Sequence, residues 1–148
     1  LKERYSAIEE TKADILSMYN HKYLQSIGVY NDEAIMKAMS TYIAGLYRSV
    51  RFGTGAHFNA NLVQLNFLRE ASVFKTNASG KFEINKDIFF DKVAELANKV
   101  LMIQVEGSYE KAGELLSKYA IIPDNLKKEI ESLSDIPRDI DTKYSFKK

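Results

Sequence analysis

The chain has no cysteine and no tryptophan, and its 148 residues include only two histidines, His21 and His57. The absence of cysteine excludes disulfide bonds and thiolate metal ligands. Neither histidine begins an H-E-x-x-H pair, so no helix of this sequence presents two imidazoles to one metal ion. Because the sequence also lacks a glycine-rich phosphate loop and a G-x-S-x-G elbow, we do not expect a self-contained active site in these residues.

The chain is nearly neutral and has no long apolar run. Lysine and arginine total 21 against 20 for aspartate and glutamate, so the net charge of +1 predicts no nucleic-acid partner. The longest apolar stretches, such as 100–105, are far shorter than the ~20 residues that cross a bilayer, so we expect no membrane partner. The chain begins with Leu1 and a charged, helix-prone segment, and we expect it to be part of a longer polypeptide.

The spacing of apolar residues predicts a mainly α fold. We expect one domain over 1–148 with about six helices and one small β-hairpin, followed by a loose tail at 137–148. The hairpin falls at 72–85, around a turn at 77–80, and the most apolar helix, 87–106, is predicted to be the central core helix. The expected helices are 7–19, 31–51, 56–71, 87–106, 108–119 and 123–133.

The first predicted helix carries an acidic face. Ser6 and Glu9 have the spacing of a capping box, in which each side chain accepts a backbone N–H of the first turn. Glu10 and Asp14 are four residues apart and lie on one side of the helix, so they form a like-charge pair, and we expect a positive group to lie over them. Tyr5, Ile8, Ile15, Leu16 and Tyr19 form the opposite, apolar face. Spacing alone favours a solvated acidic surface, because most carboxylates are exposed.

A second polar stripe lies on the predicted helix 56–71. His57, Asn61 and Gln64 follow one another at i, i+4 and i+7, and His57 lies in the first turn. The ordinary interpretation of His57 is a half-exposed histidine that contacts the turn, and His21 has no setting that suggests a function. Arg51, one turn from Arg48, has the spacing to bind a carboxylate, although a basic helix end explains this pair equally well.

Several segments together resemble the dipeptidyl peptidase III family, in particular its bacterial branch of zinc-dependent hydrolases. The run E-E-T-K-A-D is similar to the family motif E-E-C-R-A-E. Three further runs, R-F-G-T-G-A-H, Q-L-N-F-L-R-E and I-Q-V-E-G-S-Y-E-K-A, follow in the family's order. The four runs occupy 9–14, 51–57, 64–70 and 103–112.

The resemblance implies a role in a zinc metallopeptidase for each matching residue. Glu10 would be the third zinc ligand, Glu9 and Asp14 would accept hydrogen bonds from the two histidine ligands, and His57 would be a catalytic residue near the scissile carbonyl. Arg51 and Asn61 would contact the peptide substrate. The two histidines would come from an H-E-x-x-x-H helix in the missing N-terminal part of the same polypeptide.

The chain departs from the family pattern at two positions of the acidic motif. Thr11 replaces the usual cysteine, and Asp14 is one methylene shorter than the usual glutamate. The resemblance therefore predicts the C-terminal part of a peptidase cleft that is inactive by itself and holds zinc only within the complete polypeptide.

The sequence leaves one alternative function open and excludes another. A non-catalytic helical module would use the acidic face to bind a basic protein partner, and the family-like residues would serve packing only. A Nudix-type hydrolase is excluded, because Arg69-Glu70 is not followed by the glutamates that would bind Mg²⁺ in such a motif.

Overall fold

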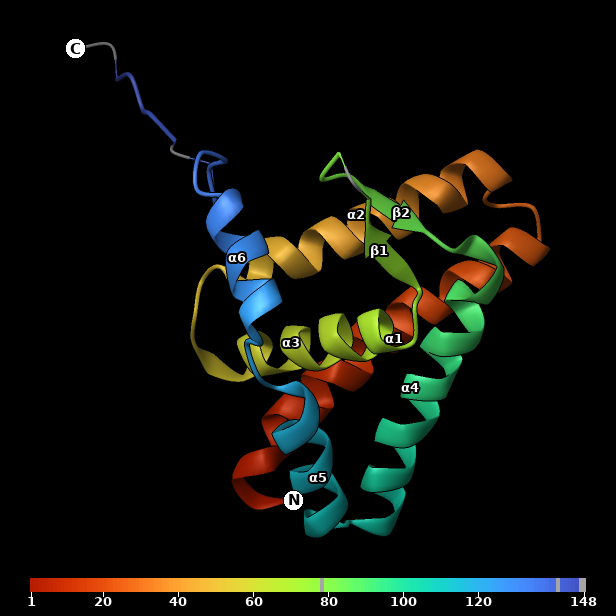
Figure 1. Cartoon of the computed structure of the whole chain (residues 1–148). Helices are drawn as coiled ribbons and strands as arrows, with labels where there is room; N and C mark the ends of the chain where they lie inside the picture. Colours follow the sequence, from red (N-terminus) through yellow and green to blue (C-terminus); the bar gives the residue numbers. More distant parts are fainter. Residues whose placement is uncertain (78, 141, 147–148) are drawn as a thin grey trace.

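The computed structural model describes residues 1–77, 79–140 and 142–146, and its mainly α architecture confirms the predicted fold class. A short 3-10 helix, η1, precedes the first α-helix, and one antiparallel β-hairpin interrupts the series (Figure 1). Ala78 of the predicted turn and three residues of the tail lie outside the described residues. The elements are η1 Lys2–Arg4, α1 Tyr5–Ser26, α2 Asp32–Val50, α3 Gly55–Glu70, β1 Phe74–Thr76, β2 Phe82–Ile84, α4 Lys86–Glu106, α5 Tyr109–Tyr119 and α6 Asp124–Ser132.

Three helix ends follow from local sequence signals. The Asn31 side chain accepts the Ala34 N–H at 2.9 Å and so caps α2. Ser108 caps α5 in the same way, accepting the Lys111 N–H at 3.2 Å. Gly107 ends α4 in the left-handed conformation, with φ of 61°, which explains why glycine stands there.

The start of α1 differs from the prediction. Its N-cap is Arg4, which makes no side-chain capping bond, so the expected capping box of Ser6 and Glu9 is wrong. The reason is that η1 leads directly into α1, and Ser6 is therefore already inside the helix. α1 also continues to Ser26, past the predicted end, because no helix breaker occurs before Gly28.

The centre of the molecule is α3 and not α4 as predicted. α3 contacts α1, α2, α4, α5 and β1, whereas α4 lies along one side of the bundle (Figure 1). The length and apolar periodicity of α4 resemble those of a core helix, but its apolar residues pack mainly against α1, α3 and α5, and Phe89 also meets Tyr42 of α2. The buried residues of α3 are Ala60, Asn61, Leu62, Val63, Gln64, Leu65, Phe67 and Leu68.

α1 is buried on two sides because it packs against both α3 and α4. Ile8 and Ile15 belong to the core as predicted, but Tyr5 and Tyr19 are 50% and 38% exposed. The predicted apolar face of this helix is therefore wrong for Tyr5 and Tyr19, which are not part of the core. The buried residues of α1 are Ala7, Ile8, Thr11, Ile15 and Met18.

A polar cluster attaches α6 to the rest of the fold. The Glu129 carboxylate of α6 accepts hydrogen bonds from Arg69 of α3 and from the hydroxyl of Tyr47 of α2. It also accepts one from Thr76 of β1 at 3.2 Å. The Glu129 side chain is 25% exposed and that of Arg69 is 19% exposed, so this ion pair is shielded more than a surface pair.

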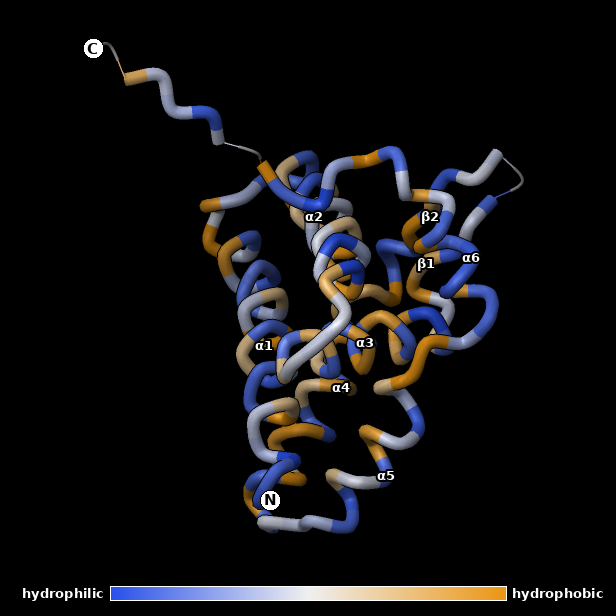
Figure 2. The backbone as a smooth tube through the Cα atoms, turned by 90° about the vertical axis from the view of Figure 1, so that its left-hand side faces the viewer, coloured by the Kyte–Doolittle hydropathy of each residue, from blue (hydrophilic) through white to orange (hydrophobic). Residues whose placement is uncertain are grey.

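The C-terminal segment touches the helical body only at its beginning. Arg48 of α2 pairs with Asp139 at 3.2 Å, and Arg138 donates to the Arg51 carbonyl at 2.9 Å. Farther along, Tyr144 and Phe146 are 77% and 86% exposed, and this part of the chain extends away from the helices in both views (Figures 1 and 2). The boundary at 137 stays a prediction.

The described helices include none that combines the length and apolarity needed to cross a membrane.

Replacement of Glu129 by alanine should lower the free energy of unfolding by about 2 kcal/mol, because Arg69 and Tyr47 would lose their shared acceptor. Chemical denaturation of the wild type and the variant measures this difference. Glu131→Ala, on the exposed side of the same helix, is the control and should change stability by less than about 0.5 kcal/mol. Equal effects of the two substitutions would contradict the assigned role of Glu129.

Candidate functional site

The acidic stripe of α1 faces the polar stripe of α3. The Oε2 atom of Glu10 lies 3.3 Å from Nδ1 of His57, and Oδ2 of Asp14 accepts a hydrogen bond from Nε2 of Gln64 at 3.1 Å. Both stripes were visible in the sequence, but their pairing was not. Each carboxylate of the like-charge pair on α1 thus has its own partner, which is an imidazole for Glu10 and an amide for Asp14.

Glu10 and His57 are both accessible to a ligand. Their side chains are 34% and 71% exposed, respectively. A carboxylate and an imidazole from two packed helices therefore converge at the surface, where either can meet a metal ion or a substrate group.

Glu9 points to a different neighbour. Its carboxylate forms a salt bridge of 2.7 Å with Lys12 and accepts a hydrogen bond from Gln104 of α4. The bond from Lys12, and then that from Gln104, lower the pKa of Glu9 from its ordinary value. Glu9 is therefore held as an ionised acceptor between α1 and α4.

Gln64 connects Asp14 to a tyrosine of α2. The Tyr42 hydroxyl donates to Oε1 of Gln64, whose own side chain is completely buried. Burial, together with the nearby charge of Asp14, raises the pKa of Tyr42 well above its ordinary value. Tyr42 therefore remains a hydrogen-bond donor throughout the physiological pH range.

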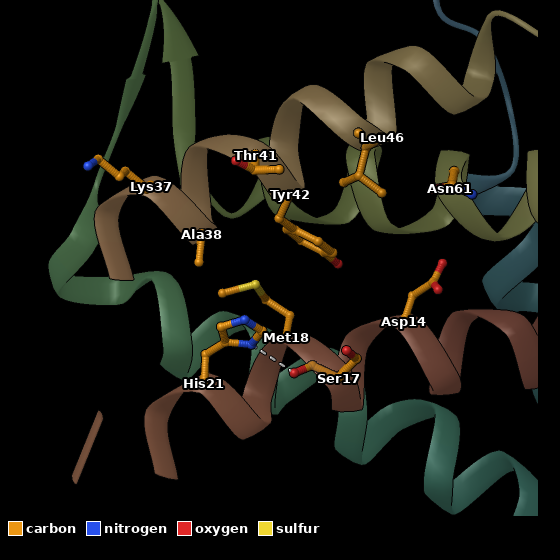
Figure 3. A pocket seen from close by; sticks show the side chains of 11 residues that line it. Asp14, Ser17, Met18, His21, Lys37, Ala38, Thr41, Tyr42, Leu46 and Asn61 are labelled. Atoms are coloured by element: carbon orange, nitrogen blue, oxygen red, sulfur yellow. Dashed lines mark hydrogen bonds between the residues drawn. The ribbon is translucent and has the colours of Figure 1, made fainter. Parts of the chain in front are cut away.

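An open cavity of about 480 Å³ adjoins this chain of hydrogen bonds. Figure 3 shows the Tyr42 ring projecting from α2 toward α1, with Asp14 and Asn61 at one end of the cavity and His21 at the other. Polar groups at the Asp14 end and apolar side chains such as Met18 and Leu46 give the cavity a mixed lining.

The other predicted residues are engaged within the fold. Asn61 is 7% exposed and donates to the His57 carbonyl at 2.6 Å, so its amide is directed back along α3. Arg51 donates to the Ile136 carbonyl and so binds the C-terminal segment. His21 bonds the Ser17 carbonyl at 3.0 Å and stacks on Tyr30, which matches its interpretation as a structural residue.

The donor set fits zinc only in part. Glu10 offers an accessible carboxylate oxygen, an ordinary zinc ligand, beside the His57 imidazole. Within 1–77, 79–140 and 142–146, however, no group of three His, Cys, Asp or Glu side chains is arranged to hold a metal ion. A zinc site that uses Glu10 therefore requires ligands from outside these residues.

The sequence interpretation missed Tyr42 and Gln104 and gave Gln64 no role. Tyr42 occupies an apolar-periodic position of α2, and that position predicts a core residue and no polar role. The sequence feature that indicates this cluster is Gln64, a long amide side chain that stands between Val63 and Leu65 in the most buried helix. A buried amide needs partners from other elements, and sequence spacing does not identify them.

Comparison with solved structures identifies the class of protein that has this fold. Dipeptidyl peptidase III from Caldithrix abyssi is 38% identical to the chain, with a TM-score of 0.87 over 94% of this chain and 27% of that enzyme. Dipeptidyl peptidase III from Corallococcus sp. strain EGB is 34% identical, with a TM-score of 0.84 over 93% of this chain and 26% of that enzyme. The chain is a dipeptidyl peptidase III-like domain and spans about a quarter of either enzyme.

A plant protein matches over nearly the whole chain but only a small part of its own length. Nudix hydrolase 3 of Arabidopsis thaliana is 32% identical over 147 residues, which is 99% of this chain and 19% of that protein. No protein-family model matches the chain. In this chain Arg69 pairs with Glu129 and Glu70 with Lys118, and among the described residues neither member of the Arg-Glu dipeptide belongs to a metal-binding carboxylate cluster.

The titration of Tyr42 should make the domain less stable as the pH rises into the alkaline range. Because its folded-state pKa is raised above the ordinary value of 10.0, its contribution is complete below that value and is lost as the pH rises toward the folded pKa. The difference in unfolding free energy between the wild type and Tyr42→Phe should therefore shrink above pH ~10, by up to about 1.4 kcal/mol per pH unit.

Urea denaturation at several pH values between ~8 and ~11 measures this difference. The lysine titrations are common to both proteins and cancel. Tyr23→Phe, at a 64% exposed tyrosine, is the matched control for the loss of a phenol hydroxyl. A constant difference for Tyr42→Phe would contradict the assignment.

Proposed function

We propose that this domain forms one wall of a zinc-dependent peptidase site in a longer polypeptide, and that the reaction is hydrolysis of a peptide bond. The complete site would release dipeptides from the N-terminus of a peptide substrate. The two similar enzymes are named as dipeptidyl peptidases. When bound, zinc would supply Lewis-acid activation of water and of the scissile carbonyl.

Each of the four proposed site residues has a distinct task. Glu10 holds the metal as the third protein ligand, beside two histidines from the remainder of the polypeptide. Glu9 and Asp14 accept the imidazole N–H groups of those histidines and fix their orientation. His57 donates a hydrogen bond to the oxygen on which negative charge develops.

The observation that supports the proposal is the convergence of Glu10 and His57 from different helices at 3.3 Å, with both side chains accessible. A metal ligand and a group that binds the same substrate oxygen have to lie near each other. A solvated acidic surface would not require an imidazole beside Glu10. The two flanking carboxylates, Glu9 and Asp14, are each held by an amide donor, which suits groups that orient other residues.

The first test is zinc content and dipeptide release in the complete polypeptide and its Glu10→Ala variant. We expect one zinc per chain and activity in the wild type, and loss of both in the variant, because two histidines alone hold zinc weakly. Glu33→Ala is a matched control, since Glu33 forms an exposed pair with Lys37 on α2. Unchanged zinc in Glu10→Ala would refute its role as ligand. A wild type without zinc would favour the protein-interaction module.

His57→Ala should separate metal binding from catalysis. Loss of a single donor to the developing oxyanion lowers kcat by about 10²–10³-fold. Zinc content should stay at the wild-type level, because His57 is not one of the proposed ligands. Steady-state kinetics and metal analysis of the same preparation test both parts. Loss of zinc would instead make His57 a ligand.

The 148-residue chain by itself is predicted to bind zinc weakly and to release no dipeptide. The reason is that Glu10 and His57 provide at most two donors, whereas catalytic zinc sites use three protein ligands. Calorimetric titration of the chain with zinc tests this. A tight one-to-one site that survives Glu10→Ala would contradict the proposal.

A further inference from the structure

Three side chains from three helices form a continuous chain of hydrogen bonds that ends on Asp14. The Tyr42 hydroxyl of α2 donates to Oε1 of Gln64 on α3. Nε2 of Gln64 donates to Oδ2 of Asp14 on α1 at 3.1 Å. These hydrogen bonds therefore cross the α2–α3 and α1–α3 contacts, and the residues at their two ends, Tyr42 and Asp14, both line the cavity (Figure 3).

The direction of this chain is fixed by one backbone group. Nε2 of Gln64 also donates to the Ala60 carbonyl at 3.1 Å, and a carbonyl oxygen can only accept. The amide nitrogen must therefore face Ala60 and Asp14, and the amide oxygen must face Tyr42. Both N–H groups of Gln64 are thereby used, and Tyr42 has to be the donor.

Gln64 differs from the other buried polar side chains among the described residues. Thr11 and Asn61 bond to a carbonyl four residues earlier on their own helices. Gln64 does this as well but also reaches both neighbouring helices. Burial of an amide is costly compared with burial of an apolar side chain of the same size, so its cross-helix bonds call for an explanation other than packing.

We propose that Gln64 and Tyr42 are positioning residues for the Asp14 carboxylate. Tyr42 fixes the orientation of the Gln64 amide, and Gln64 holds Oδ2 of Asp14. Oδ1 is then directed to the N–H of a histidine zinc ligand. The identity of that last partner rests on the proposed function, whereas the ordering of Asp14 does not.

The arrangement also compensates for the length of Asp14. Aspartate reaches one methylene less than the glutamate found in the similar motif, so its carboxylate has less freedom to find an imidazole by changing rotamer. When the Gln64 amide fixes one oxygen of the carboxylate, the direction of the other oxygen is fixed as well. The raised pKa of Tyr42 keeps this donor protonated.

The first experiment uses the chain as it stands and needs no metal. Side-chain amide signals of Gln64 in ¹H–¹⁵N NMR spectra should exchange slowly with solvent and should shift in both Asp14→Asn and Tyr42→Phe. Gln25 is the matched control, because its amide also donates to a carboxylate, Asp32 at 2.8 Å, but at the surface. If either substitution left the Gln64 signals unchanged, the proposed chain of hydrogen bonds from Tyr42 through Gln64 to Asp14 would be overturned.

The second experiment measures zinc affinity of the complete polypeptide by chelator competition. Gln64→Met keeps the volume of the side chain and removes the donor, and we expect about 10–100-fold weaker zinc binding. Gln64→Glu, which keeps the acceptor for Tyr42 but not the donor for Asp14, should weaken zinc binding as much. Gln25→Met should leave it unchanged. Thermal unfolding of each variant identifies any loss caused by misfolding.

The outcomes distinguish this inference from the proposed function. Zinc affinity that is unchanged in both Gln64 variants, with zinc bound to the wild type, would overturn the positioning role and leave the peptidase proposal intact. A wild type without zinc would refute the peptidase proposal and the histidine partner. The ordering of Asp14 would then be decided by the NMR result alone.

Discussion

The contact between α1 and α3 is the constraint on which the rest of this structure depends. It joins α1 to the central helix α3, and it does so through directional polar bonds as well as apolar packing. Apolar side chains tolerate a shift of one helix along another, but a hydrogen bond between Gln64 and Asp14 does not. The same bond therefore fixes the register of the two helices and brings Glu10 next to His57.

The helices were predictable because their signals are local. Asn31, Ser108 and Gly107 mark helix ends through contacts with residues at most four positions away, and apolar periodicity identifies the segments between them. The failed capping box has the opposite origin. Ser6 and Glu9 match the motif, but η1 and the contacts of Arg4 with Tyr109 of α5 extend the helix past them. A local signal fails where a tertiary contact overrides it.

The candidate site could be predicted only as two separate halves. Spacing placed Glu10 and Asp14 on one helix face, and His57, Asn61 and Gln64 on another. Which residue meets which depends on the crossing of helices about 50 residues apart in sequence, as the separation of Asp14 and Gln64 shows. Contacts of that kind leave no trace in a single sequence. Family resemblance indicated the expected roles, whereas the structure identifies the pairs Glu10–His57 and Asp14–Gln64.

The departures from the family motif are consistent with the surroundings of each position. Thr11 replaces a cysteine at a fully buried position, and its hydroxyl donates to the Ala7 carbonyl at 2.7 Å. A small side chain is thus retained and its polar group is satisfied within the helix. Asp14 is different, because a shorter carboxylate changes the reach of the functional group itself. Gln64, the longest polar side chain on the buried face of α3, donates to one oxygen of this carboxylate, so only the other oxygen is left to be oriented by a further partner.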